Sequence, residues 1–118
     1  MAEALQILVV ERESLIALDI ERTVLATLEG ASVTLSRPVE SIREGRRFDL
    51  VVCDREMDPA ILDFWRRRVE EEGCAFVLTT SGDREDGDPD VWPVVRKPFS
   101  EDELVDAVRL ALSRAERP

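Results

Sequence analysis

Near-continuous apolar runs, separated by segments of helical periodicity, constrain the fold of this chain more than any other feature. Three of the five runs are near-continuous apolar stretches rich in valine, leucine and isoleucine, as a strand buried on both faces of a parallel sheet requires. They predict five strands of one parallel sheet, at residues 6–10, 31–36, 48–54, 75–81 and 91–96.

Helical patterns fill most of the intervals between these runs. Strands that alternate with helices favour right-handed crossovers, and they predict a doubly wound α/β sheet. Ser100 and Glu103 have the spacing of a capping box at the start of the last helix. The expected helices are 14–28, 39–46, 59–72 and 100–115.

The spacing of apolar residues predicts the buried face of two helices. One interval between strands lacks a helical pattern. Segment 82–90, GDREDGDPD, is rich in Gly, Pro and Asp, so it predicts a short or irregular fourth helix before the last strand. The expected buried faces are Leu15, Leu18, Val24, Leu25 and Leu28 in the first helix, and Ile61, Leu62, Trp65 and Val69 in 59–72.

The length and composition of the chain exclude several classes of function. The length of 118 residues predicts one domain over 1–118, with no apolar run long enough to span a membrane. A net charge of −10 argues against binding to nucleic acid or to an anionic membrane. The chain has no histidine, which excludes histidine chemistry within it, and Cys53 and Cys74 are interpreted as reduced packing residues of a cytoplasmic protein.

Polar residues directly follow, or end, four of the predicted strands. They are Glu11 and Arg12, then Asp54, then Thr79 and Thr80, and finally Lys97, the single lysine of the chain. The carboxyl ends of parallel strands meet at one edge of the sheet, where such folds place their functional crevice. A carboxylate, a hydroxyl and an ammonium at one edge suit phosphoryl transfer to the aspartate.

The segments ILVVERESLI, FDLVVCDREM, FVLTTSGD and VVRKPF together resemble the CheY-like receiver domains of bacterial response regulators. The resemblance implies a flavodoxin-like sheet of order 2-1-3-4-5 and makes Asp54 the phosphoacceptor. It makes Thr79, or its neighbour Thr80, and Lys97 the groups that bind the phosphoryl oxygens. It also implies a cis peptide bond between Lys97 and Pro98.

The chain departs from this family at the metal site. The resemblance implies a Mg²⁺ ion held by Glu11, Asp54 and the backbone of Glu56, but Arg12 stands where receivers usually carry a second acid. Two unit charges about 4 Å apart interact by roughly 4 kcal/mol at an effective dielectric constant near 20, so Arg12 is expected to weaken Mg²⁺ binding. Three interpretations stay open: a weakly bound metal, Arg12 in place of the metal's charge, and a permanent ion-pair network around Asp54.

The expected function is signalling rather than enzymatic catalysis. A separate histidine kinase or phosphotransfer protein would phosphorylate Asp54, and the chain would then contact an unknown downstream protein. The alternative is a pseudo-receiver that binds its partner without phosphorylation, with Arg12 replacing the metal. In receivers an aromatic residue three positions before the lysine often moves on activation; here that position is Val94, and Trp92 is the nearby aromatic residue of this output face.

Overall fold

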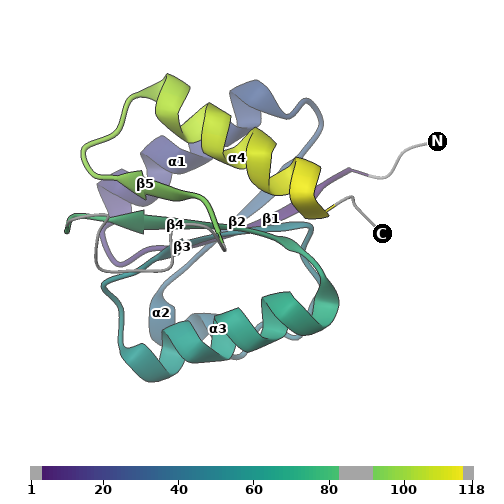
Figure 1. Ribbon diagram of the computed structural model, residues 1–118, viewed down its shortest axis with the longest axis vertical. Coiled ribbons are helices and arrows are strands. Elements are labelled where there is room, and N and C mark those ends of the chain that lie inside the picture. Colours follow the sequence, from purple (N-terminus) through teal and green to yellow (C-terminus); the bar gives the residue numbers. More distant parts are fainter. Residues whose placement is uncertain (1–3, 83–91, 116–118) are drawn as a thin grey trace.

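A five-stranded parallel sheet in the order β2-β1-β3-β4-β5 forms the centre of the computed structural model, which describes residues 4–82 and 92–115 (Figure 1). This order and the parallel pairing confirm the predicted fold class. The strands are β1 (Gln6–Val10), β2 (Ser32–Ser36), β3 (Leu50–Asp54), β4 (Ala75–Thr80) and β5 (Val94–Arg96).

Helices cover both faces of the sheet. Figure 1 shows α1 (Ser14–Thr27) and α4 (Glu101–Ala115) on one face, with α2 (Pro38–Ser41) and α3 (Pro59–Glu72) on the other. No helix within 4–82 or 92–115 has the length and apolar character needed to cross a bilayer.

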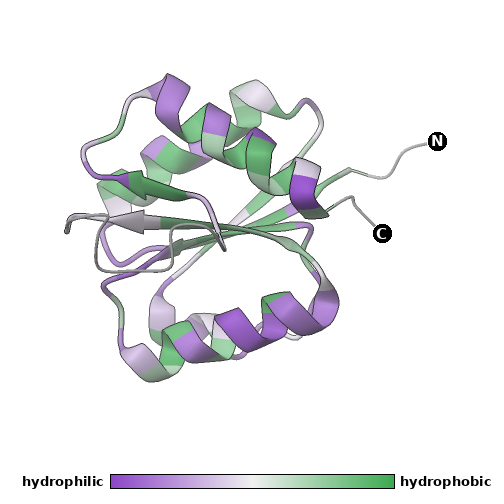
Figure 2. Ribbon diagram, viewed as in Figure 1, coloured by the Kyte–Doolittle hydropathy of each residue, from purple (hydrophilic) through white to green (hydrophobic). Residues whose placement is uncertain are grey.

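The strands carry apolar side chains on both faces because two apolar clusters sandwich them. Along β1, Ile7 and Val9 belong to the cluster under α1 and α4, whereas Leu8 and Val10 belong to the cluster under α3. Figure 2 shows this pattern as hydrophobic strands between helices whose hydrophilic residues are concentrated on their outer sides. The core thus fixes the sheet, and with it the positions of the strand ends.

Two helix starts are capped by side chains. Asp58 accepts a hydrogen bond from the backbone of Ala60 at the start of α3. Ser100 and Glu103 exchange two hydrogen bonds of 3.1 Å each before α4, which confirms the predicted capping box. Gly73 ends α3 with a φ of 69°, a left-handed conformation that glycine adopts without steric cost.

The predicted buried face of α1 was wrong for three leucines. Leu15 is 83% exposed, and Leu18 and Leu25 are also exposed. The prediction holds for Val24, which is buried together with Ala17 and Ile20 in a second apolar line at the same three- and four-residue spacing. Periodicity identifies both lines but does not tell which of them faces the sheet.

Most elements differ from the predicted bounds by one or two residues, but α2 and β5 are much shorter than predicted. α2 ends at Ser41, after which the backbone bonds from Arg43 to Glu40 and from Glu44 to Ser41 span only three residues, as in a tight turn. The fifth strand begins at Val94. The irregular fourth helix expected over 82–90 lies outside the described residues, apart from Gly82, and so does residue 91.

We predict that Leu104→Ala lowers the free energy of unfolding by about 2–5 kcal/mol, since Leu104 is fully buried between α4 and the sheet. Leu110→Ala on the same helix is the matched control, because Leu110 is 45% exposed whereas Leu104 is fully buried; we expect a loss below about 1 kcal/mol. Urea denaturation followed by circular dichroism measures both. Equal losses in the two variants would contradict the assigned face of α4.

Candidate functional site

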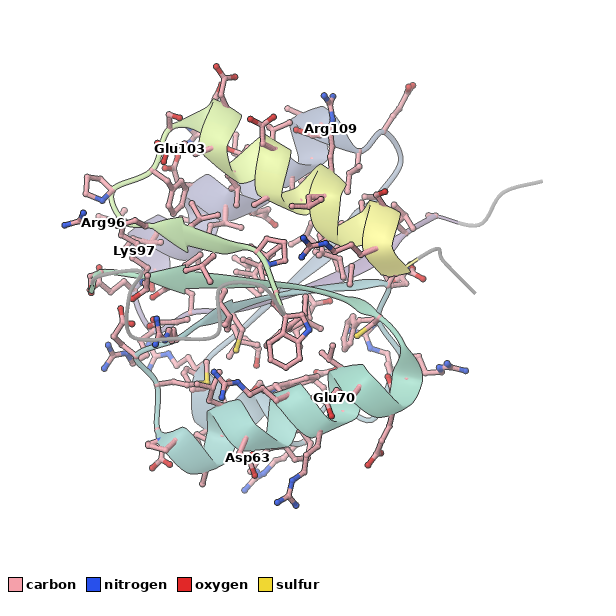
Figure 3. The ribbon with its side chains drawn as sticks, in the orientation of Figure 1. Asp63, Glu70, Arg96, Lys97, Glu103 and Arg109 are labelled. Atoms are coloured by element: carbon pink, nitrogen blue, oxygen red, sulfur yellow. The ribbon has the colours of Figure 1, made fainter. Side chains whose placement is uncertain are left out.

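Polar side chains from four strand ends meet at the carboxyl edge of the sheet. Asp54 ends β3 and lies in register with Thr79 of β4, while Glu11 directly follows β1. All three are at most 4% exposed. Figure 3 shows Lys97 at the same edge, just past β5. The structure therefore brings together the strand-end residues singled out from the sequence.

The Lys97 ammonium lies between two buried carboxylates. Its Nζ is 2.8 Å from Oε1 of Glu11 and 3.5 Å from Oδ1 of Asp54. Burial alone lowers the pKa of Lys97, but the hydrogen bond to Glu11 and the negative charges of Asp54 and Glu11 outweigh it, so the pKa is raised. Lys97 therefore remains positively charged at neutral pH.

The backbone around Lys97 holds this geometry. Its N–H donates to the carbonyl of Thr80 at 2.6 Å, which ties the residue to the end of β4. The Lys97–Pro98 peptide bond is cis, in agreement with the expectation.

Arg12 contacts the other oxygen of Asp54. Its Nε lies 3.5 Å from Oδ2 of Asp54, and the Arg12 side chain is 58% exposed whereas that of Asp54 is 1% exposed. The guanidinium thus reaches the rim of the site from solvent. We call Glu11, Arg12, Asp54 and Lys97 the strand-end cluster; its two carboxylates and two cations balance in formal charge.

The two threonines at the end of β4 have different environments. Within the described residues, the Thr79 hydroxyl and Oδ2 of Asp54 are buried and have no hydrogen-bond partner. The Thr80 hydroxyl donates to Oε2 of Glu56 at 2.7 Å and accepts from the N–H of Gly82 at 3.0 Å. Thr79, rather than Thr80, therefore has hydrogen-bonding capacity to offer a ligand at Asp54.

The Glu56 side chain has a role that the sequence reasoning missed. Its backbone N–H donates to Oδ1 of Asp54 at 3.0 Å, and its carboxylate accepts from Thr80 and from both the N–H and the hydroxyl of Ser81. Burial raises the pKa of Glu56. The hydrogen bonds from Ser81 and Thr80 and the positive charge of Lys97 outweigh this effect, so the pKa is lowered overall. In the sequence, the adjacent hydroxyl residues Thr80 and Ser81 at the end of a predicted strand were the feature that could have indicated a carboxylate partner.

Comparison with known proteins identifies the fold. No protein-family model and no curated protein matches the chain. Its structure is similar to that of a response regulator receiver protein from Sinorhizobium medicae, with 25% identity, a TM-score of 0.74, and coverage of 97% of this chain and 98% of the other. It is also similar to a response regulator from Thermotoga maritima, with 20% identity, a TM-score of 0.74, and coverage of 94% and 99%.

The chemotaxis response regulator CheY4 of Vibrio cholerae is similar over 93% of this chain and 100% of its own, with 16% identity and a TM-score of 0.73. The chain has the CheY-like receiver fold. These matches cover nearly the whole of each receiver.

The donor set at this edge of the sheet does not fit Mg²⁺. Oε1 of Glu11 accepts from Lys97, and Oε2 accepts from the N–H of Glu13 at 3.0 Å, so both oxygens are engaged. Arg12 lies against Asp54, and the described residues contain no group of three acidic, histidine or cysteine side chains that could hold a metal ion. Mg²⁺ prefers oxygen ligands in near-octahedral geometry, which this arrangement does not supply.

The residues predicted for the output face of the receiver pack against the apolar cluster under α3. Trp92 makes an edge-to-face contact with Phe76 at a centroid distance of 5.1 Å, and the Arg66 guanidinium lies 5.7 Å from its ring. Val94 is half-buried against the same cluster. Neither residue belongs to the strand-end cluster.

We predict that Lys97→Met destabilises the protein by about 3 kcal/mol, because it leaves the Glu11 and Asp54 carboxylates buried without the cation between them. Lys97→Arg keeps the charge in a bulkier form and should cost less. Arg109→Met, which removes an exposed cation on α4, is the control and should change stability by less than about 0.5 kcal/mol. Urea denaturation at pH 7 measures all three, and a neutral Lys97→Met would contradict the assigned role.

Proposed function

We propose that this chain is a signalling receiver in which Asp54 accepts a phosphoryl group from a separate histidine kinase or phosphotransfer protein. The phosphorylated chain then acts through contacts with a downstream protein. Its role is to carry a signal rather than to turn over an external substrate. Exchange with such a kinase places this role in the cytoplasm.

One observation carries the proposal: the Asp54 carboxylate is buried beside Lys97, Arg12 and the unpartnered hydroxyl of Thr79. Phosphoryl transfer needs an in-line nucleophile and positive charge around the phosphoryl oxygens, with little further chemistry from the protein. Asp54 supplies the nucleophile, Lys97 a compact charge, and Thr79 a hydrogen-bond donor. The solved receivers of the same fold support this assignment.

The transfer is balanced in atoms and electrons. An oxygen of the Asp54 carboxylate bonds to phosphorus, and the bond between phosphorus and the donor's histidine nitrogen breaks. The nitrogen keeps the electron pair and takes up one proton from the buffered solvent, so the donor histidine returns to its neutral form. The product is an acyl phosphate whose phosphoryl oxygens carry the charge that Lys97 faces.

A second function is favoured by the contact between Arg12 and Asp54. Arg12 and Lys97 already neutralise the strand-end cluster, so Asp54 has compensating charge without any phosphoryl group. In this alternative the chain is a pseudo-receiver that binds its partner through a fixed surface. Once a partner is captured, Asp54→Asn separates the two functions: retained binding without a phosphodonor response supports the pseudo-receiver.

Incubation with acetyl phosphate and magnesium chloride tests the leading proposal. We expect the intact mass to rise by one phosphoryl group in the wild type and to stay unchanged in Asp54→Asn. Asp58→Asn is the matched control, because Asp58 is an exposed helix cap near the site and asparagine also caps helices well. Loss of the mass gain in Asp58→Asn as well, or its absence in the wild type, would overturn phosphorylation at Asp54.

Replacing each threonine by valine distinguishes their roles. We predict that Thr79→Val changes the free energy of unfolding by less than about 1 kcal/mol but slows phosphorylation about tenfold or more, because its hydroxyl has no partner in the free protein. Thr80→Val should instead cost about 1–3 kcal/mol of stability, since it leaves Glu56 and Gly82 short of a partner. Urea denaturation and the rate of mass gain provide the two measurements, and a reversed pattern would exchange the two assignments.

A further inference from the structure

We propose that the strand-end cluster holds a phosphoryl group without a divalent cation, and that the Arg12 guanidinium supplies the charge that an ion supplies in receivers with two acids at this position. This inference rests on the proposed function of Asp54. It assigns a ligand-binding role to Arg12 and predicts a phosphorylation chemistry independent of metal.

The charge of the cluster supports the exchange of metal for Arg12. Replacing one carboxylate by one guanidinium changes the local charge by two positive units, which equals the charge of a divalent ion. The formal charges of Glu11, Arg12, Asp54 and Lys97 sum to zero without any bound ion. Adding a divalent ion would place two further positive charges beside Arg12, whereas a phosphoryl dianion on Asp54 would face two cations.

The geometry leaves hydrogen-bonding groups for a phosphoryl group. Oδ2 of Asp54 and the Thr79 hydroxyl are buried without hydrogen bonds, although Nε of Arg12 lies 3.5 Å from that oxygen. A guanidinium carries five donors in a planar fork that matches phosphate oxygens, so Arg12 has donors in excess of its present contact. The site thus combines an unpartnered hydroxyl with a cation that has unused donors.

The position of Arg12 allows it to follow the ligand. Arg12 lines two surface hollows of mixed character, one shared with Lys97 and the acidic Glu56, and the other shared with Met57 and the acidic Asp58. Because more than half of the Arg12 side chain is exposed, it can shift along this rim without disturbing the core. A phosphoryl group on Asp54 can therefore displace the guanidinium outward and still remain in contact with it.

Metal binding by itself provides the first test, with Mn²⁺ as the probe and amide NMR signals as the readout. We expect sub-millimolar Mn²⁺ to leave the amide signals of Glu11, Asp54 and Glu56 unbroadened in the wild type. Arg12→Asp adds a carboxylate and removes the guanidinium, so the same signals should broaden. Arg22→Glu, an exposed site on α1 with the same change in net charge, should behave as the wild type.

The rate of phosphorylation by acetyl phosphate provides the second test. An oxygen of Asp54 bonds to phosphorus as the bond from phosphorus to the acetyl oxygen breaks, and acetate leaves with the electron pair. We expect the wild-type rate with EDTA to be within about twofold of the rate with Mg²⁺. In Arg12→Asp the rate with EDTA should fall at least tenfold below its rate with Mg²⁺, while Arg22→Glu keeps the wild-type pattern.

The two tests separate the inference from the function on which it rests. Broadening in the wild type, or at least tenfold acceleration of the wild type by Mg²⁺, overturns the role of Arg12 but leaves phosphorylation of Asp54 standing. If the wild type is never phosphorylated, the proposed function fails and, with it, the binding of a phosphoryl group. In that case the Mn²⁺ arm still decides whether Arg12 has replaced the ion.

Discussion

The compensation of two buried carboxylates by two cations is the interaction on which the site depends. Asp54 and Glu11 are withdrawn from water at the ends of adjacent strands, an arrangement that is costly unless each carboxylate is paired. Lys97 pairs with both of them, and Arg12 contacts the free oxygen of Asp54. The sheet register makes this pairing possible, since β1, β3 and β4 fix the carboxylates relative to the lysine that follows β5.

This chain has the CheY-like receiver fold, but it carries Arg12 at a position where the resemblance implied an acidic residue. The sheet order is that of the fold, and Lys97 lies at the carboxyl edge of the sheet, as expected from the sequence. Arg12 places a guanidinium 3.5 Å from Oδ2 of Asp54 at the rim of the site. In the proposal above, this contact supplies the charge that a divalent ion would otherwise supply.

Local patterns in the sequence predicted the strands, α3, α4 and the meeting of Glu11, Asp54 and Lys97, because parallel strands bring their carboxyl ends to one edge. They failed for the buried face of α1, where two apolar lines compete and only packing selects one. The direction of Arg12 was also beyond prediction, since a long side chain at a loop has many rotamers. The hydrogen bonds of Glu56 connect segments that are 24 residues apart, a separation that spacing does not reveal.

Glu56 joins the nucleophile to the neighbouring strand through one residue. Its amide donates to Asp54, while its carboxylate receives three hydrogen bonds from Thr80 and Ser81 at the end of β4. Phosphorylation of Asp54 would make its carboxylate a weaker acceptor for that amide, so this connection would loosen at its Asp54 end. Glu56 is therefore the residue through which a change of bonding at Asp54 would reach the end of β4.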